Sequence, residues 1–264
     1  MIVAKNLDTS IFGHFHNIPK EETNEIKQRF VKHVHTYRCE LLYFLKGKAS
    51  FNIEGNQREL KPGDCIFVPS GKYHCISVDE RQDYERFVLE FYVQKIPFSS
   101  SLDISSLAGF YHNSELDISN ILYEIEEKVG KYKEEEFQDY FYASIGKILY
   151  LLSLSPKSQE TQKEDMLSSI LTYLKDHIYE DIQIEDLSLQ FHMNPTSLNR
   201  YFKTQMDVSL HHYIKNMKMQ KAYNLLLSGK KPEEIYQILG YNDYSTFYRC
   251  FVSTFSLSPK QVKI

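Results

Sequence analysis

The sequence predicts two domains of different class: an N-terminal all-β barrel followed by a helical hairpin, and a C-terminal all-α domain with two repeated pairs of helices. Three observations predict this. Residues 30–93 contain short apolar segments between turn residues, residues 115–153 change to a helical period, and every segment after 165 favours helix. A chain of 264 residues with 42% hydrophobic residues has enough apolar material for two ordinary cores.

The predicted strands are short and rich in β-branched or aromatic residues, and glycine-containing turns separate them. They cover residues 41–45, 50–53, 65–68 and 87–91. Regular alternation of short strands with turn signals is typical of a small antiparallel barrel or sandwich. We assign the barrel to residues 1–112.

The predicted hairpin covers residues 113–154 and has two apolar stripes. Ile118, Ile121 and Ile125 share one face of its first helix, and Ile145 and Leu149 share one face of the second. Such a hairpin can cover an open end of the barrel or form a dimer contact, and the sequence favours neither. The polar segment 155–165, which contains Pro156, is the predicted linker.

The C-terminal domain, residues 166–264, is predicted to be entirely helical. Pro195 occupies a first-turn position, and Asp181, Asn194 and Asp243 are candidate N-caps. The expected helices cover residues 166–179, 184–191, 195–206, 209–228, 232–239 and 243–254.

A repeat links two of these helices. Arg200, Phe202 and Ser209 recur 49 positions later as Arg249, Phe251 and Ser258. Each copy follows a shorter helix and a tight turn, so each forms a helix-turn-helix unit. The alternative, a plain helical bundle with solvated polar faces, does not require such a repeat.

The faces opposite the apolar residues of these two helices carry side chains suited to DNA. Arg pairs with guanine and Asn with adenine in the major groove, while Ser, Thr, Tyr and Lys suit phosphate oxygens. The predicted contacts with double-stranded DNA are Thr196, Asn199, Arg200, Lys203, Tyr244, Ser245, Tyr248 and Arg249.

Charge alone does not suggest nucleic acid. Residues 165–264 contain 11 Lys and Arg against 10 Asp and Glu, and residues 1–164 contain 20 against 25. A membrane span and a signal peptide are both unexpected, because long apolar runs are absent from the sequence, so we expect a cytoplasmic protein. The four cysteines lack CxxC spacing and are expected to be structural thiols.

The C-terminal hundred residues resemble the DNA-binding domain of the AraC family of transcription regulators. The matching positions are Leu187, Leu198, Asn199, Arg200, Tyr201, Phe202, Lys203, Ser209, Tyr213, Ile214, Ala222, Leu225, Leu226, Ile235, Leu239, Gly240, Tyr241, Asp243, Ser245, Phe247, Arg249, Phe251, Ser258 and Pro259. The resemblance implies a connecting helix near 209–228, a small-molecule effector, a homodimer and contact with RNA polymerase.

The sequence departs from the AraC pattern at five positions. Asp207 and Ser256 replace the usual Gly after each recognition helix, and Lys218 replaces the usual Arg of the connecting helix. Tyr236 replaces a small residue, and Val252 replaces a Lys. The loss of that Lys predicts weaker electrostatic binding by the second unit.

The barrel carries a second motif, which resembles the two signature motifs of cupins. His33-x-His35-x4-Glu40 is followed by Pro69-x-Gly71-x2-His74. In metal-binding cupins, the equivalents of these His and Glu residues hold one divalent transition metal, such as zinc, iron, manganese, cobalt or nickel.

Two interpretations of this motif stay open. Val78 stands where the cupin pattern has Asn, and the same His and Glu side chains could instead bind the effector, a carbohydrate for example. The resemblance therefore favours a ligand-responsive regulator rather than an enzyme. The alternative is a metal-dependent cupin enzyme, or a metal sensor, with a fused helical domain.

Overall fold

The computed structural model describes residues 12–18 (backbone only), 32–79, 83–96, 102–112, 117–129, 131–157 and 165–262. Contacts between Cα atoms divide the chain into two compact units, Met1–Thr161 and Gln162–Ile264. Most of the predicted linker, residues 158–164, lies outside the described residues.

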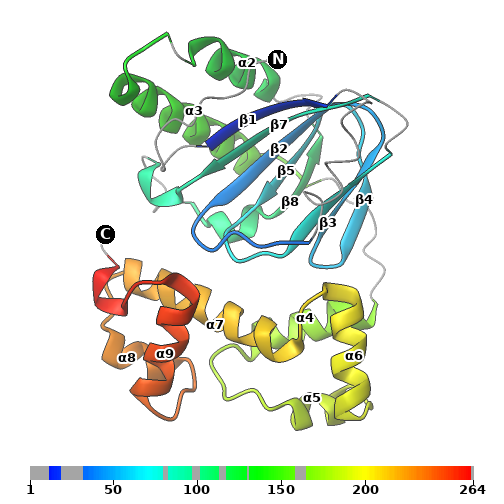
Figure 1. Ribbon diagram of the computed structural model, residues 1–264, viewed down its shortest axis with the longest axis vertical. Helices are drawn as coiled ribbons and strands as arrows, with labels where there is room; N and C mark the ends of the chain where they lie inside the picture. The colour runs from blue at the N-terminus through cyan, green and yellow to red at the C-terminus, as the bar shows by residue number, and fades with distance from the viewer. Residues whose placement is uncertain are drawn as a thin grey trace. The chain divides into compact units, whose positions relative to one another are not determined.

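The first unit contains two antiparallel sheets (Figure 1). The larger sheet has the strand order β1-β7-β2-β5-β8, and the smaller has the order β4-β3-β6. The strands are β1 Phe12–Ile18, β2 Cys39–Lys46, β3 Ala49–Ile53, β4 Asn56–Glu59, β5 Asp64–Val68, β6 His74–Val78, β7 Tyr84–Phe91 and β8 Gly109–His112. Short 3-10 helices follow β7 at Val93–Lys95 and precede β8 at Ile104–Leu107.

The four predicted strands are confirmed as parts of β2, β3, β5 and β7. The other four strands lacked a strong apolar run in the sequence. β4, for example, has the sequence NQRE and is largely exposed, so its pairing with β3 rather than its composition makes it a strand.

The central strands of the larger sheet are buried on both faces. Leu42 and Phe44 of β2 point into the core between the two sheets, together with Phe51 of β3. Leu41 and Tyr43 of the same strand point to the opposite face. Side chains alternate along a strand, so an unbroken apolar strand requires a cover on each side.

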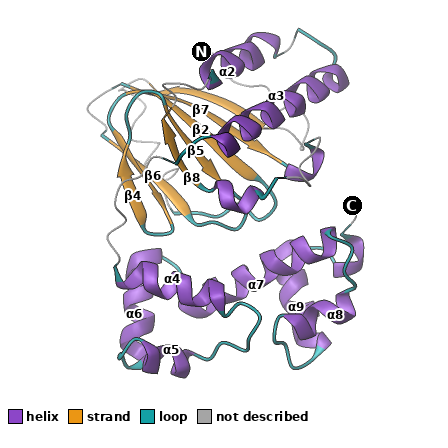
Figure 2. Cartoon of the chain, turned by 180° about the vertical axis from the view of Figure 1, so that it is seen from behind, coloured by secondary structure: helices purple, strands orange, loops and turns teal. Residues whose placement is uncertain are grey.

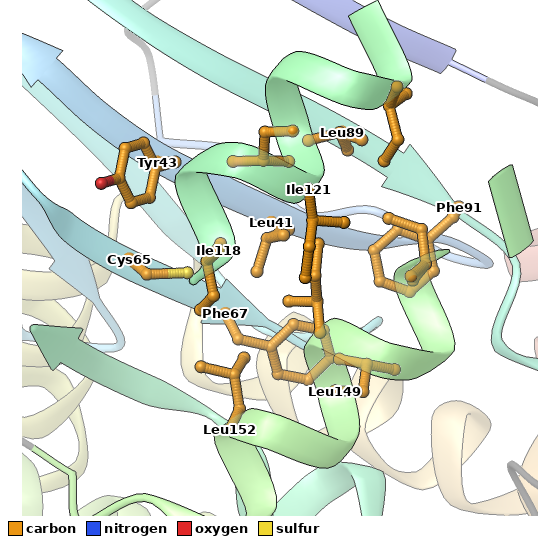
Figure 3. Close-up of a cluster of buried hydrophobic side chains, with 14 of the residues drawn as sticks. Leu41, Tyr43, Cys65, Phe67, Leu89, Phe91, Ile118, Ile121, Leu149 and Leu152 are labelled. Atoms are coloured by element: carbon orange, nitrogen blue, oxygen red, sulfur yellow. The ribbon is translucent and has the colours of Figure 1, made fainter. Parts of the chain in front are cut away.

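A helical hairpin supplies the second cover. α2 spans Ile118–Lys128 and α3 spans Glu134–Leu154. Ile121 of α2 and Leu149 of α3 pack against Leu41 and Phe67 on the outer face of the larger sheet (Figure 3). The hairpin is thus confirmed as two helices, but it covers a sheet face rather than an open end of the barrel.

The second unit is all-helical (Figure 2). Its helices are α4 Met166–Asp176, α5 Ile184–Gln190, α6 Pro195–Met206, α7 Leu210–Leu227, α8 Pro232–Ile238 and α9 Tyr244–Phe255, followed by a 3-10 turn at Pro259–Gln261. All six predicted helices are present, with ends within about three residues of those predicted. Among the described residues, none of the helices is long and apolar enough to cross a membrane.

Two of the three predicted N-caps are correct. Asn194 accepts a hydrogen bond from the Ser197 backbone N–H at 2.8 Å, and Asp243 accepts one from Thr246 at 2.8 Å. Asp181 does not cap α5, because that helix begins after Gln183, two residues further along the chain. Helix ends depend on backbone geometry as well as on the presence of a suitable polar residue.

Candidate functional site

The second unit contains two helix pairs with the same turn geometry: α5–α6, the first helix pair, and α8–α9, the second. The Met193 N–H donates to the Ser188 carbonyl, and the Tyr241 N–H donates to the Tyr236 carbonyl, each at 2.9 Å. The residue before each donor has a left-handed backbone, with φ of 52° at His192 and 68° at Gly240. These are matching helix ends of the Schellman type.

The two turns differ in length by one residue. His192 lies two positions before the N-cap Asn194, whereas Gly240 lies three positions before the N-cap Asp243. The 49-residue offset therefore holds for the second helix of each pair, and the first helices correspond at an offset of 48 residues. The repeat seen in the sequence is a structural repeat with one inserted residue in its second turn.

The second helices of the pairs, α6 and α9, bury matching apolar faces. Leu198 and Phe202 of α6 correspond to Phe247 and Phe251 of α9, and all four are fully buried. Both helices end in a left-handed residue, Asp207 with φ 57° and Ser256 with φ 55°. The two positions where the family pattern has Gly thus keep the conformation that Gly would favour.

The opposite faces of α6 and α9 are open to solvent. Arg200 is the sixth residue of α6 and Arg249 the sixth of α9, and both are exposed. The Arg249 guanidinium lies along its own helix, with Nη2 3.4 Å from Thr246 Oγ1. Four other predicted DNA contacts are also exposed: Thr196, Lys203, Ser245 and Tyr248.

Two predicted contacts are less accessible. Asn199 is half-buried and its side-chain amide donates to the Pro195 carbonyl at 3.1 Å. The Tyr244 ring is half-buried and packs edge-on against Tyr236 at 5.9 Å. Either side chain would have to change rotamer to reach far from its helix.

The first unit brings the four predicted barrel residues together. His33 and His74 form an isolated backbone bridge, with both N–H···O distances at 2.9 Å. The Gly71 N–H donates to the His35 carbonyl at 2.8 Å, so the second motif is hydrogen-bonded to the first. Glu40 projects from β2 into the same place.

The side chains of this cluster are in mutual contact. Glu40 Oε2 lies 3.1 Å from His35 Nε2 and 3.4 Å from His74 Nε2, and the His33 and His74 ring centroids are 4.3 Å apart. One potential ligand atom from each of the four residues lies within 4.8 Å of all the others. We call His33, His35, Glu40 and His74 the barrel cluster. The spacing of these atoms fits a single bound cation.

Electrostatics favours charge separation within the barrel cluster. Burial raises the pKa of Glu40, but hydrogen bonds from His35 and His74 outweigh burial and hold that pKa well below its usual range. Burial lowers the pKa of His74, but its contacts with Glu40 and with the Lys72 carbonyl outweigh this and raise the pKa. Nδ1 of His74 donates to that carbonyl at 2.9 Å, which directs Nε2 into the cluster.

A second group of charges surrounds the cluster, and the sequence did not single it out. Arg38 Nη1 donates to Glu90 Oε2 at 3.0 Å, and His35 Nδ1 lies 3.7 Å from the same carboxylate oxygen. Glu90 faces Glu40 across the β2–β7 pair. The available signal was that Glu40 precedes an apolar run in β2 and Glu90 interrupts the apolar run 87–91 of β7.

The two sites correspond to two known domain families. The cupin domain family matches residues 21–86, and the helix-turn-helix domain family matches residues 187–263. Each match covers the motif on which the geometry above depends.

Three similar proteins match over most of their own length. The uncharacterized HTH-type transcriptional regulator YdeC of Bacillus subtilis (strain 168) is 24% identical over 85% of this chain and 83% of its own. The probable transcriptional regulator LumQ of Photobacterium leiognathi is 22% identical over 86% and 89%. The HTH-type transcriptional activator RhaS of Mannheimia succiniciproducens is 23% identical over 89% and 90%.

These relatives are transcription regulators, and each match extends over most of both chains, so it spans both matched regions of this chain. The chain belongs to the AraC family of helix-turn-helix transcription regulators and carries an N-terminal cupin domain.

Proposed function

We propose that α6 and α9 enter two successive major grooves of double-stranded DNA, and that Arg200 and Arg249 contact bases there. The observation that carries this proposal is the equivalence of the two arginines. Each is the sixth residue of its helix, is exposed, and lies opposite a fully buried apolar face. A guanidinium in this position suits the O6 and N7 acceptors of guanine.

The remaining contacts divide unequally between the two helices. Thr196 and Lys203 on α6, and Ser245 and Tyr248 on α9, are assigned to phosphate oxygens. Val252 of α9 occupies the position of Lys203, so the second helix pair lacks one cationic contact. The first helix pair therefore supplies more of the electrostatic binding. Asn199 and Tyr244 contribute after a change of rotamer.

Arginine substitutions test the assignment. In the full chain, Arg200→Ala should weaken binding to a selected duplex by about tenfold or more, because one bidentate base contact is worth about 1–3 kcal/mol. Binding to a shuffled duplex should change far less. Lys175→Ala is the matched control, since it removes the same charge from the exposed surface of α4. Equal losses on both duplexes would show that Arg200 contacts phosphate only.

The proposed effector is a small polar molecule bound beside the barrel cluster, and carbohydrates are the class we favour. The cluster and the neighbouring Arg38–Glu90 pair present imidazole, carboxylate and guanidinium groups side by side. Such groups supply both donors and acceptors for sugar hydroxyls. A ligand of this kind regulates only if it binds two arrangements of the protein with different affinity.

The effector proposal is tested with a panel of monosaccharides and the full chain. A binding sugar should raise the thermal unfolding midpoint of the wild type and leave the midpoint of Glu40→Gln unchanged. An equal rise in both proteins would place the sugar away from the barrel cluster.

Metal sensing is the second candidate function of the same cluster. Three imidazoles and one carboxylate with potential ligand atoms within 4.8 Å suit a divalent transition metal, and the Lys72 carbonyl orients His74 for coordination through Nε2. Metal analysis of purified protein should then find about one equivalent in the wild type and far less in His74→Ala. Metal-free protein with unchanged DNA binding would reject this function. A metal-dependent enzyme is not favoured, because the family consists of regulators.

We also propose that the chain forms a homodimer through the outward ridge of α3. Asp139, Ala143, Lys147 and Tyr150 lie three or four residues apart along this ridge and are exposed, and Leu154 extends it. Ala143 is small, and Asp139 and Lys147 lie four residues before and after it. In an antiparallel pair of α3 helices crossing at Ala143, Asp139 of each copy would face Lys147 of the other.

Charge reversal tests the dimer. Lys147→Glu should shift the full chain toward monomer in sedimentation equilibrium, and combining Asp139→Lys with Lys147→Asp should restore the dimer. A dimer that is insensitive to all three changes would have its interface on another surface. A dimer would present four DNA-binding helices at a promoter, where contact with RNA polymerase is a further proposed interaction.

A further inference from the structure

Lys218 is a buried lysine at the middle of α7, the helix that joins the two helix pairs. It is the ninth of the 18 residues of α7, and only 5% of its surface is exposed. Its Nζ donates to the Glu180 carbonyl at 2.5 Å and to the Leu239 carbonyl at 2.8 Å. Burying an ammonium group costs free energy, and burial lowers the pKa of this one. The two hydrogen bonds and the negative charge of nearby Asp181 oppose that cost.

The first acceptor belongs to the segment that leads into the first helix pair. Glu180 lies in the turn between α4 and α5, and its N–H donates to the His177 carbonyl at 2.9 Å. The His177 ring stacks on Tyr173 at 4.0 Å, and Tyr173 contacts Phe191 at the end of α5 at 6.0 Å. The position of the Glu180 carbonyl is therefore tied to α5.

The second acceptor belongs to the second helix pair. Leu239 is the C-cap residue of α8, directly before the turn that leads to α9. Lys218 Nζ also lies 5.4 Å from the centroid of the Tyr241 ring, which contacts Phe247 of α9 at 5.7 Å. One ammonium group thus contacts the turn that precedes α9 as well as the turn that precedes the first helix pair.

The two segments also touch through their backbones at this place. A Cβ added to Gly240 would lie 2.7 Å from the Glu180 carbonyl carbon and 2.8 Å from the Asp181 nitrogen. The equivalent position of the first pair, His192, is exposed and carries a side chain at nearly the same φ. The turn itself therefore tolerates a side chain, and the contact with Glu180 requires Gly at position 240.

We propose that Lys218 is a positioning residue that sets the separation of α6 and α9, and with it the spacing between the two half-sites that the chain accepts on DNA. The proposal rests on the proposed role of α6 and α9 in base contact. Connecting two binding modules rigidly raises the effective concentration of the second at its site. Loosening the connection lowers the affinity for a duplex that carries both half-sites, and it leaves the affinity for a duplex with one half-site unchanged.

The test uses the full chain and a duplex selected from a random library by the wild type. Fluorescence polarisation compares this duplex with versions in which one half-site is scrambled, or in which two base pairs are inserted between the half-sites. Lys218→Met keeps the length of the side chain and removes the donor. This variant should bind the intact duplex with about tenfold or more lower affinity than the wild type. Its affinity for either single half-site should fall by less than about twofold. The two-base-pair insertion should weaken DNA binding by Lys218→Met less than it weakens DNA binding by the wild type.

Lys218→Arg is the conservative variant that tests whether a donor at this position is what matters. Lys218→Arg, which keeps donors for both carbonyls, should restore the intact duplex to within about threefold of the wild type. Equal losses by Lys218→Met on intact and single half-sites would show a general stability role and overturn the proposal, as would unchanged binding throughout. Should Lys218→Met fail to fold, Lys218→Gln, which keeps an N–H donor, is judged by the same comparisons. Failure of the wild type to select any duplex would instead refute the proposed function.

Discussion

The contact between Gly240 and the Glu180–Asp181 backbone gives a sharp stability prediction. Gly240→Ala places a methyl group under 3.0 Å from three backbone atoms of that segment. It also puts a non-glycine residue at φ 68°. Backbone atoms cannot move aside as a flexible side chain can, so one helix pair must shift relative to the other.

The magnitude follows from two costs. A left-handed conformation costs an alanine about 1 kcal/mol, and overpacking of a tight contact typically costs about 1–3 kcal/mol. Gly240→Ala should therefore destabilise the second unit by about 2–4 kcal/mol. Gly229→Ala is the matched control, because Gly229 has φ 86° but its added Cβ would meet nothing within 4 Å. The control should cost about 1 kcal/mol or less, since alanine also restricts the unfolded chain.

Hydrogen exchange of the full-length proteins, followed by mass spectrometry, separates the two variants. The expected difference of about 2 kcal/mol corresponds to about a 30-fold faster exchange of amides in α8 and α9 in Gly240→Ala than in Gly229→Ala. Equal exchange in the two variants would refute the close approach between Gly240 and residues 180–181.

Three further predictions concern local structure. Ser256→Gly should raise the free energy of unfolding by about 0.5–1 kcal/mol, measured by thermal unfolding, because Ser256 has φ 55° at the end of α9; a loss of stability would contradict the left-handed end. Hydrogen bonds from the Thr246 backbone and hydroxyl hold the pKa of Asp243 in the folded protein below its usual value. The stability that ionised Asp243 contributes is therefore present above its pKa in the unfolded chain and is lost as the pH falls through its pKa in the folded protein. The advantage of wild type over Asp243→Asn in thermal midpoint should accordingly shrink from about pH 6 to about pH 3, and an advantage that is constant with pH would contradict this. Leu149→Ala should cost about 2–5 kcal/mol because Leu149 is fully buried against the larger sheet, while Tyr150→Ala, at a side chain 53% exposed, should change monomer stability little; similar costs for both would contradict the docking of α3.

Local signals were enough to predict most of the fold and which candidate side chains lie at equivalent positions or close together. The helical repeat placed Arg200 and Arg249 at equivalent positions, because helix periodicity and capping depend on residues close in sequence. The His33 and His74 motifs predicted the barrel cluster, because the turn at Gly71 returns the chain to His35. In both cases the sequence pattern encodes the geometry directly.

Features that depend on distant segments were missed. The position of the hairpin required knowing that β2 is buried on both faces, and an apolar run alone does not reveal what covers each face. Glu90 lies beside the barrel cluster because β7 pairs with β2 and places it opposite Glu40. Lys218 bonds to two backbone carbonyls far away in sequence, and carbonyl acceptors carry no residue-type signal.

Selection of binding sites by the purified full chain from a random duplex library tests most directly whether α6 and α9 read two sites on DNA. Two recognition helices held on one connecting helix predict enriched sequences with two conserved boxes, centred about 10 base pairs apart. Arg200→Ala should lose preference in one box and Arg249→Ala in the other. Enrichment of a single uninterrupted box, or preference lost from the same box in both variants, would contradict the assignment of one box to each helix.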